Sequence, residues 1–152
     1  MESNNSSGDD IKSSLSSWTF GKETPLKFDS HIKKSVPGYE FGHELICKYF
    51  DFFVNIKPKI VYDLGCSTGT LINKLNSRHK NNDINFIGLD EQDKMLEMAL
   101  NKSNIKNGNS LEFLHTNIYE YDFKKCSCII SYYTIQFIAP YFRQELINKI
   151  YS

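Results

Sequence analysis

The segment Asp63–Gly69, DLGCSTG, contains residue types and a spacing that suit two kinds of chemistry. Its last five residues fit the pattern G-x-S-x-G, the nucleophile elbow that presents a reactive serine in α/β-hydrolases. The whole segment also fits a glycine-rich turn that follows an acidic residue at a strand end and holds a nucleotide-type cofactor. The first interpretation makes the protein a hydrolase, and the second makes it a cofactor-binding transferase.

The order of elements and histidines along the chain distinguishes these two interpretations. In an α/β-hydrolase the elbow lies after several strands, and the acid and then the histidine of the triad follow it. Only one clear helix and one strand are expected before this segment, and the histidines after it, His79 and His115, fall on the next helix and the third strand. The sequence also has no stretch like HGGG that would build an oxyanion hole. We therefore favour the cofactor loop.

Hydrophobic periodicity predicts the elements that position this loop. Apolar residues recur at helical spacing from Phe41 to Val54, and Pro58 marks the end of that helix. Short apolar stretches predict strands at 59–64, 84–90, 111–116 and 128–133. Further helical patterns lie at 70–79, 91–102 and 140–151. This alternation implies an α/β fold with a doubly wound, mainly parallel sheet that is covered on both faces.

Composition restricts the domain organisation and the partners. The 152 residues are enough for one domain, and residues 1–17 are so rich in Ser, Asn, Asp and Gly that we expect a disordered tail before a domain spanning 18–152. Eighteen basic residues balance eighteen acidic ones, so charge gives no reason to expect direct nucleic-acid binding. The sequence has no secretory segment and no run of about 18 apolar residues. We therefore expect a cytoplasmic protein without a membrane partner.

The cysteines and histidines give no support for a metal site. The sequence contains four of each, and their spacings match none of the patterns that are typical of zinc ligands. Cys126 and Cys128 form C-x-C, and in an extended strand their side chains point to opposite faces. We therefore expect buried structural thiols and no metal.

Polar residues follow the predicted strands at the edge where a cofactor would lie. Gly65 allows a tight turn, and Gly69 permits close packing between helix and strand. Asp90 ends the second strand, where a carboxylate can accept two hydrogen bonds from a ribose diol. Asn117 and Ile118 follow the third strand, where a polar and an apolar side chain suit the edge and the face of an adenine. Together these residues predict a nucleotide-type cofactor.

The glycine spacing distinguishes an adenosyl ligand from a dinucleotide. The dinucleotide fingerprint is G-x-G-x-x-G, whereas this chain has D-x-G-x-S-x-G from Asp63 to Gly69. That pattern resembles motif I of the class I S-adenosylmethionine-dependent methyltransferases, whose usual form is D-x-G-x-G-x-G. The resemblance implies a Rossmann-like fold of the class I methyltransferase type, with S-adenosylmethionine as the cofactor.

Further segments resemble one family with this fold more closely. They are WTF at 18–20, SVPGY at 35–39, YDLGCS at 62–67, TIQF at 134–137 and KIY at 149–151. In this order they resemble the carboxy-S-adenosyl-L-methionine synthases, which are bacterial enzymes similar to methyltransferases. The resemblance implies transfer of carbon dioxide from prephenate to the methyl group of S-adenosylmethionine through a sulfonium ylide. The products would be phenylpyruvate and carboxy-S-adenosylmethionine, the donor for wobble-uridine modification in tRNA.

The same resemblance implies a set of cofactor-binding residues but no catalytic base. The set is Tyr39, Gly65, Cys66, Ser67, Asp90, Glu91, Asn117, Ile118 and Tyr132. Its loop residues would line the methionine part of the cofactor, the pair after the second strand would hold the ribose, and the pair after the third strand would contact adenine. Tyr39 would reach the ligand from the segment before the first helix. Asn117 stands where the family has aspartate, and Tyr132 stands where it has asparagine.

Members of that family are much longer than this chain. We therefore expect only the first four strands of the sheet, and the match ends before an arginine that pairs with the carboxylate of the product in the family. The fourth strand would leave an apolar edge at Ile129 and Ile130, which a second copy or a complementing chain would cover. Two other functions stay open: a methyltransferase that acts on another substrate, and an inactive fragment that only binds ligand.

Overall fold

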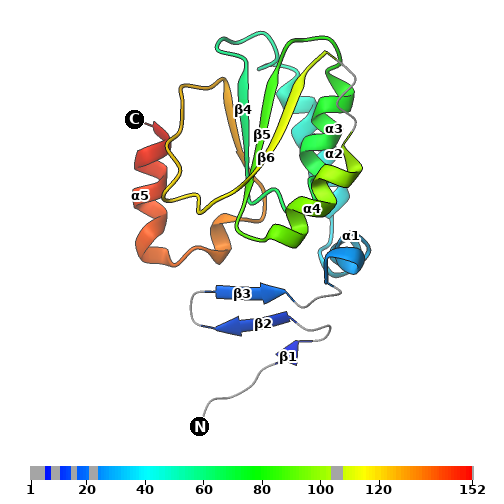
Figure 1. Ribbon diagram of the computed structural model, residues 1–152, viewed down its shortest axis with the longest axis vertical. Coiled ribbons are helices and arrows are strands. Elements are labelled where there is room, and N and C mark those ends of the chain that lie inside the picture. Colours follow the sequence, from blue (N-terminus) through cyan, green and yellow to red (C-terminus); the bar gives the residue numbers. More distant parts are fainter. Residues whose placement is uncertain (1–5, 8–10, 15–16, 21–23, 104–107, 152) are drawn as a thin grey trace.

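A parallel sheet of four strands forms the centre of the fold (Figure 1). The computed structural model describes residues 6–7, 11–14, 17–20, 24–103 and 108–151, with side chains from residue 28 onward. The strands are β4 (Ile60–Leu64), β5 (Asn85–Asp90), β6 (Ser110–His115) and β7 (Cys128–Ser131). Their spatial order is β6-β5-β4-β7, and each neighbouring pair is parallel. The chain therefore winds outward from β4 to β6 and then returns to the other side of β4, which confirms the predicted doubly wound sheet.

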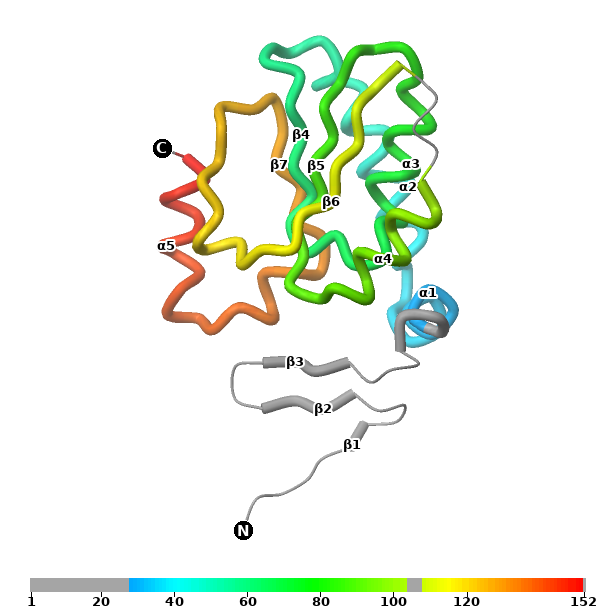
Figure 2. The backbone as a smooth tube through the Cα atoms, viewed as in Figure 1, coloured from blue at the N-terminus to red at the C-terminus, as the bar shows by residue number. Residues whose placement is uncertain are grey.

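Helices cover both faces of this sheet, as the tube in Figure 2 also shows. They are α2 (Tyr39–Phe50), α3 (Thr70–Arg78), α4 (Asp93–Lys102) and α5 (Pro140–Tyr151), with a short 3-10 turn η1 (Ile135–Phe137) before α5. α2, α3 and α4 lie on one face, and α5 lies on the other. The predicted helices are confirmed, with ends that differ by a few residues.

Alternating strand residues build one core on each side of the sheet. Val61 and Phe86 point to the side of α2 and α3, while the next residue on each strand, Tyr62 and Ile87, points to the side of α5. Leu146 of α5 is 1% exposed and closes the second core. Because both faces are buried, the strands are apolar at nearly every position, which is the pattern that made them recognisable in the sequence.

The α2 helix buries a different stripe from the one that periodicity predicts. Its buried residues are His43, Cys47 and Phe50, whereas Phe41 and Tyr49 are 67% and 60% exposed. The apolar residues of this helix are spread around more than half of its circumference, so the pattern alone does not locate the buried side. As a result, a histidine rather than a phenylalanine faces inward near the start of α2.

The expected apolar edge on β7 is not found. Among the described residues β7 pairs only with β4, so its other edge has no neighbouring strand there. However, Ile130 packs into the core beside α2, and Ile129 packs against the core beside α5. Side chains of a strand point to the faces of a sheet and not to its edge. The edge of β7 therefore presents backbone groups, and the two isoleucines are covered by helices.

The region before α2 contains a helix that the sequence patterns do not predict. This helix, α1 (Thr24–Ser35), follows three short strands, β1 (Ser6–Ser7), β2 (Ile11–Ser14) and β3 (Ser17–Phe20), which form an antiparallel sheet. β1, β2 and the first residue of β3 occupy part of the range predicted as a disordered tail, and residues 1–5, 8–10 and 15–16 of that range lie outside the described residues. Ladder pairing uses backbone groups, so it can form in a stretch that is poor in apolar residues. The domain boundary at residue 18 stays a prediction.

Candidate functional site

The loop between β4 and α3 has the geometry that the glycine pattern predicts. Gly65 and Gly69 have φ angles of 67° and 69°, which L side chains rarely adopt. A Cβ at Gly65 would lie 2.6 Å from the side chain of Thr134, and one at Gly69 would lie 2.8 Å from the Cβ of Ala99. The structure thus confirms a tight turn at the first glycine and close packing at the second.

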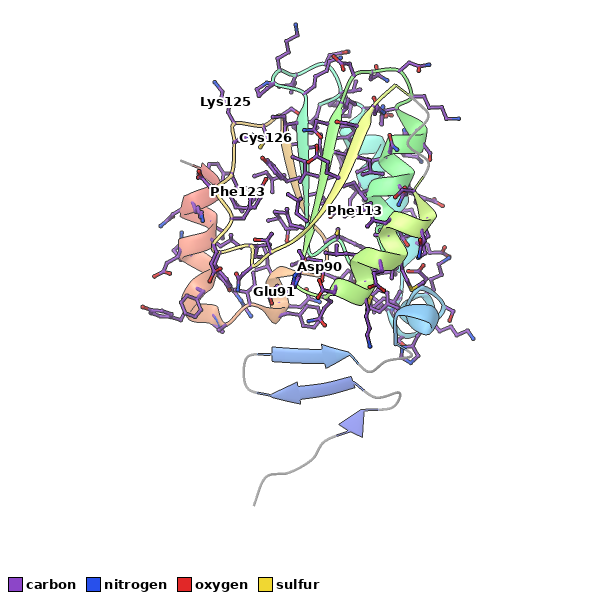
Figure 3. The ribbon with its side chains drawn as sticks, viewed as in Figure 1. Asp90, Glu91, Phe113, Phe123, Lys125 and Cys126 are labelled. Carbon is purple, nitrogen blue, oxygen red and sulfur yellow. The ribbon has the colours of Figure 1, made fainter. Side chains whose placement is uncertain are left out.

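Asp90 at the end of β5 holds this loop in place. Its Oδ2 accepts a hydrogen bond of 2.8 Å from the backbone N–H of Ser67, and its Oδ1 accepts one of 2.9 Å from the N–H of Gln92. Burial raises the pKa of the Asp90 carboxyl, although these backbone donors act in the opposite direction. Figure 3 shows Asp90 and Glu91 at one end of the sheet and Lys125 and Cys126 at the other. The two acidic residues therefore lie at the carboxyl ends of the strands.

A second carboxyl, that of Asp63, lies beneath the loop without a charged partner. It is 3% exposed, and the described residues provide neither a hydrogen bond nor an ion pair to its carboxyl. Burial is the main cause that raises the pKa of Asp63 to about 8, and the negative charge of Asp90 adds to it. A cationic group bound beside Asp63 would stabilise its ionised form. The site is therefore suited to a ligand that carries positive charge.

A pocket opens beside this loop, where α1, α2 and the end of β7 meet it. The residues that line it are Phe28, Tyr39, His43, Asp63, Gly65, Cys66, Ser67, Thr68, Thr70, Leu71 and Tyr132. Five of the nine sequence-predicted site residues are among them, namely Tyr39, the three loop residues 65–67 and Tyr132. Tyr39 and Tyr132, which are 93 positions apart in the sequence, thus share one pocket with the loop, and their contact with a cofactor stays a prediction.

The other four predicted residues lie outside that pocket, at the ends of β5 and β6. Asp90 reaches the loop through Ser67, and its backbone oxygen accepts a hydrogen bond of 3.0 Å from Thr116, just before Asn117. The Oδ1 of Asn117 accepts a hydrogen bond of 2.8 Å from the N–H of Tyr119, so one of its lone pairs is already used. The predicted adenine contacts and the role of Glu91 stay predictions.

Ile118 is more buried than its expected role suggests. The sequence analysis assigns it to the face of an adenine, but its side chain is 8% exposed and packs into the core beside α5 with Leu64 and Leu89. Its position after the third strand is the one predicted. The residue follows the turn that Asn117 forms, and this turn directs its side chain toward the core. Little of that side chain is left for a ligand to contact.

The hydroxyl and thiol groups of the loop are not arranged for nucleophilic attack. Burial raises the pKa of Cys66 well above its usual range, so its thiol stays protonated. The hydroxyl of Ser67 lies 3.6 Å from the sulfur of Met95, and no histidine contacts it among the described side chains. A serine nucleophile requires a base within hydrogen-bond reach. This geometry excludes the hydrolase interpretation of the GCSTG segment.

The α1 helix contributes a contact to the loop that sequence reasoning missed. Asp29 accepts hydrogen bonds from the hydroxyls of Thr68 (2.6 Å) and Thr70 (3.2 Å) and from Lys102 of α4. Burial opposes ionisation, but these donors outweigh it and lower the pKa of Asp29. The partners lie 39 to 73 positions away along the chain, so no local pattern identifies them. Asp29 therefore connects α1 to both the loop and α4.

Solved structures with the same fold are S-adenosylmethionine-dependent enzymes. The magnesium protoporphyrin IX methyltransferase of Synechocystis, solved with bound S-adenosylmethionine, has a TM-score of 0.63 and 18% identity, and the match covers 74% of this chain and 53% of that enzyme. A putative S-adenosylmethionine-dependent methyltransferase of Methanococcus maripaludis has a TM-score of 0.62 and 20% identity, over 91% of this chain and 61% of that one. At these identities the likeness establishes the fold, which is the predicted class I methyltransferase type. The ligand in the first structure is the predicted cofactor.

Sequence comparison identifies the family. Carboxy-S-adenosyl-L-methionine synthases of Sulfurimonas denitrificans and Nitratiruptor are each 37% identical over 88% of this chain. The match covers 55% and 54% of those enzymes, so this chain spans about half the length of the curated relatives it matches. The methyltransferase domain profile matches residues 61–152. This chain belongs to the methyltransferase domain family, and its curated relatives are carboxy-S-adenosyl-L-methionine synthases.

Proposed function

We propose that this chain binds S-adenosylmethionine at the carboxyl ends of β4, β5 and β6. The observation that carries the proposal is the pair of buried carboxyls at these strand ends. Asp90 fixes the glycine loop through Ser67, while Asp63 beneath that loop has no described cationic partner. S-adenosylmethionine has a sulfonium and an ammonium group, and either cation would compensate the buried charge of Asp63.

Each part of this ligand has a candidate place along the strand ends. The methionine part would lie in the pocket beside the loop, whose lining also includes Tyr39 and Tyr132. Asp90 would accept hydrogen bonds from the ribose hydroxyls through the lone pairs that its backbone donors leave available, with Glu91 beside it. Asn117 would offer its amide to the edge of adenine, while Ile118 would offer only a small part of its surface.

For the whole reaction we propose carboxy-S-adenosyl-L-methionine synthesis, in keeping with the names of the relatives. Prephenate would supply carbon dioxide, which becomes bonded to the methyl carbon of S-adenosylmethionine. The hydroxyl of prephenate would leave as water with a methyl proton, and the ring would become the aromatic ring of phenylpyruvate. The carboxylated product would then serve wobble-uridine modification in tRNA. The sulfonium supplies the activation, and the protein supplies orientation and charge.

A second candidate function is ligand binding without turnover, or methyl transfer to another substrate. The described arginines favour this alternative, because neither reaches the pocket. Arg78 forms a bidentate pair with Asp51, and Arg143 donates to the backbone oxygens of Ile138 and Gln136. A carboxylate on the sulfonium methyl would therefore lack a guanidinium partner among the described residues.

The partners and the location of the chain are further parts of the proposal. The edge of β7 presents backbone groups that a second copy or a complementing chain would pair with. We also propose a cytoplasmic protein, whose small-molecule substrate makes direct contact with nucleic acid unnecessary. Across the part of the chain that the structure describes, no helix is long and apolar enough to cross a membrane.

Calorimetric titration of the 152-residue chain tests this proposal. We expect micromolar binding of S-adenosylmethionine, and a preference for its carboxylated form if synthase activity is retained. Asp90→Ala should weaken binding about tenfold or more, because hydrogen bonds to a charged group are lost. Asp122→Ala, which changes an exposed carboxylate in the loop before β7, is the matched control and should leave affinity unchanged. A folded chain that binds neither form would refute the proposal.

A further inference from the structure

A residue that lines the pocket has a buried polar atom without a partner among the described residues. His43 is 2% exposed, and its Nδ1 makes no hydrogen bond to any described residue. Buried side-chain nitrogens in folded proteins are nearly always hydrogen-bonded, because an unpaired one loses its water without compensation. His43 lines the same pocket as Asp63 and the glycine loop. Its unpaired nitrogen is therefore available to a partner that is not part of the described chain.

Neighbouring rings fix the position of this imidazole. His43 lies one turn of α2 after Tyr39, and its ring centroid is 4.5 Å from that of Tyr39 and 5.2 Å from that of Tyr132. The hydroxyl of Tyr132 donates a hydrogen bond of 3.2 Å to the backbone oxygen of Tyr39. A Cβ at Gly42 would lie 1.9 Å from that hydroxyl, so the glycine makes room for the tyrosine. The histidine is thus held between two aromatic walls rather than left to rotate toward solvent.

The charge state of the ring decides what it can bind. Burial is the main cause that lowers the pKa of His43 to about 4, so the ring is neutral near pH 7. A neutral imidazole has one N–H donor and one acceptor nitrogen. The acceptor that suits an ammonium group in this pocket is the carboxyl of Asp63. The group left for His43 is then an anion, which requires the N–H donor.

We propose that the Nδ1–H of His43 donates a hydrogen bond to the α-carboxylate of the methionine part of the ligand, while Asp63 accepts from its α-ammonium group. This assignment rests on the proposed function, and it adds a specificity: the pocket selects adenosyl ligands with a zwitterionic amino-acid end. Neither the spacing of motifs nor the family resemblance points to His43. The two groups come from different elements, α2 and β4, and both line the pocket.

Decarboxylated S-adenosylmethionine is the probe that tests this assignment, because it retains the ammonium and the sulfonium and lacks only the carboxylate. The wild-type chain should bind S-adenosylmethionine at least tenfold more tightly than the decarboxylated ligand. His43→Phe keeps an aromatic ring between the two tyrosines and removes the donor. This variant should lose about tenfold in affinity for S-adenosylmethionine and little for the decarboxylated ligand. Equal losses for both ligands, or no loss for either, would overturn the assignment.

His79→Phe is the matched control. His79 is also buried, but its Nε2 lies 3.2 Å from the Oδ1 of Asp51, and its ring packs against Phe50 and does not line the pocket. Its variant should keep the wild-type ratio of affinities for the two ligands. Two measurements need only the wild-type chain. The first is the ratio of its affinities for the two ligands, and the second is the imidazole nitrogen signals in NMR spectra. The Nδ1 signal should shift on addition of S-adenosylmethionine and not of 5′-methylthioadenosine, and a shift with both would refute the contact.

The proposed function and this inference fail in different ways. If the wild-type chain binds none of these adenosyl compounds, the proposed function is wrong and His43 has no such ligand. If the wild-type chain binds S-adenosylmethionine and its decarboxylated form equally well, the proposed function stands and the role of His43 is wrong. A selective loss in His43→Phe supports both.

Discussion

Buried polar groups lie at both ends of the sheet, and the side-chain amide of Asn109 at one end is paired within the protein, whereas two groups at the other end are not. At the amino ends of β5 and β6, Asn109 donates to the Oδ1 of Asn76 (3.0 Å) and to the backbone oxygen of His79 (2.8 Å), and its own Oδ1 accepts from the N–H of Ile84 (3.1 Å). At the carboxyl ends, Asp63 and the Nδ1 of His43 have no such partners among the described residues.

The difference separates a structural cluster from a binding site. A buried polar group that is fully paired stabilises the native state and specifies its geometry. A buried group without a partner destabilises the free protein, so it persists where a ligand completes it. The two ends of this sheet thus provide an internal comparison, in which a substitution at one end should change stability and one at the other should change binding.

The largest expected effect is at the paired amide of Asn109. Asn109→Ala removes the three hydrogen bonds described above, so the N–H of Ile84 and the backbone oxygen of His79 lose this buried partner. We expect the free energy of unfolding to fall by about 2–4 kcal/mol, which is a large part of the stability of a small domain. Urea denaturation followed by circular dichroism measures this loss. The folded fraction of this variant should bind the ligand as tightly as the wild type. A loss of affinity without a loss of stability would contradict the assignment of Asn109 to a structural role.

Asp63→Asn should have the opposite signature, with weaker binding and a more stable free protein. The pKa of Asp63 in the folded protein, about 8, lies above its unfolded value near 3.8. The folded state therefore binds an extra proton between these values, and its stability falls as the pH rises from about 4 to 8. The asparagine variant cannot ionise, so it should lose this slope and be the more stable protein at pH 8. Urea denaturation of both proteins at pH 5 and pH 8 tests this expectation.

The pH dependence of ligand binding also tests the role of Asp63. A cationic ligand requires the ionised carboxylate, so wild-type affinity for S-adenosylmethionine should rise between pH 6 and pH 8, and binding should release a proton. The variant should bind at least tenfold more weakly at pH 8 and show little dependence on pH. If affinity in the variant equals that of the wild type at pH 8, Asp63 does not face the cation of the ligand.

Much of the fold follows from the sequence, and the candidate site follows only in part. The strands were predictable because burial on both faces makes them continuously apolar, and the loop was predictable because glycine spacing reflects backbone geometry. His43 was not predictable, because the apolar residues of α2 surround the helix and do not show which side is buried. Asp29 was not predictable either, because its contacts cross from α1 to residues far along the chain. Contacts of that range have no signature in local periodicity.

The smallest expected effect concerns that contact between α1 and the loop. Asp29→Asn removes the charge that accepts hydrogen bonds from Thr68 and Lys102 and keeps the size of the side chain. Asp29 is half-buried, so solvent screens part of the interaction, and we expect a loss of about 1 kcal/mol in stability. Because Thr68 belongs to the loop, affinity for S-adenosylmethionine should fall a few-fold.

The pH dependence of this variant gives its sharpest readout. The pKa of Asp29 is lowered in the folded protein, so its contribution to stability is present above pH 4 and is lost as the pH falls further. Wild-type protein and variant should therefore converge in stability near pH 3, whereas the effect of Asp63→Asn grows toward pH 8. Lys33→Gln changes another charged residue of α1, which forms an exposed ion pair with Glu40 of α2; it is the control and should leave affinity unchanged. If Asp29→Asn and Lys33→Gln weakened binding equally, the overall charge of α1 would affect the site, and the specific contact between Asp29 and the loop would not.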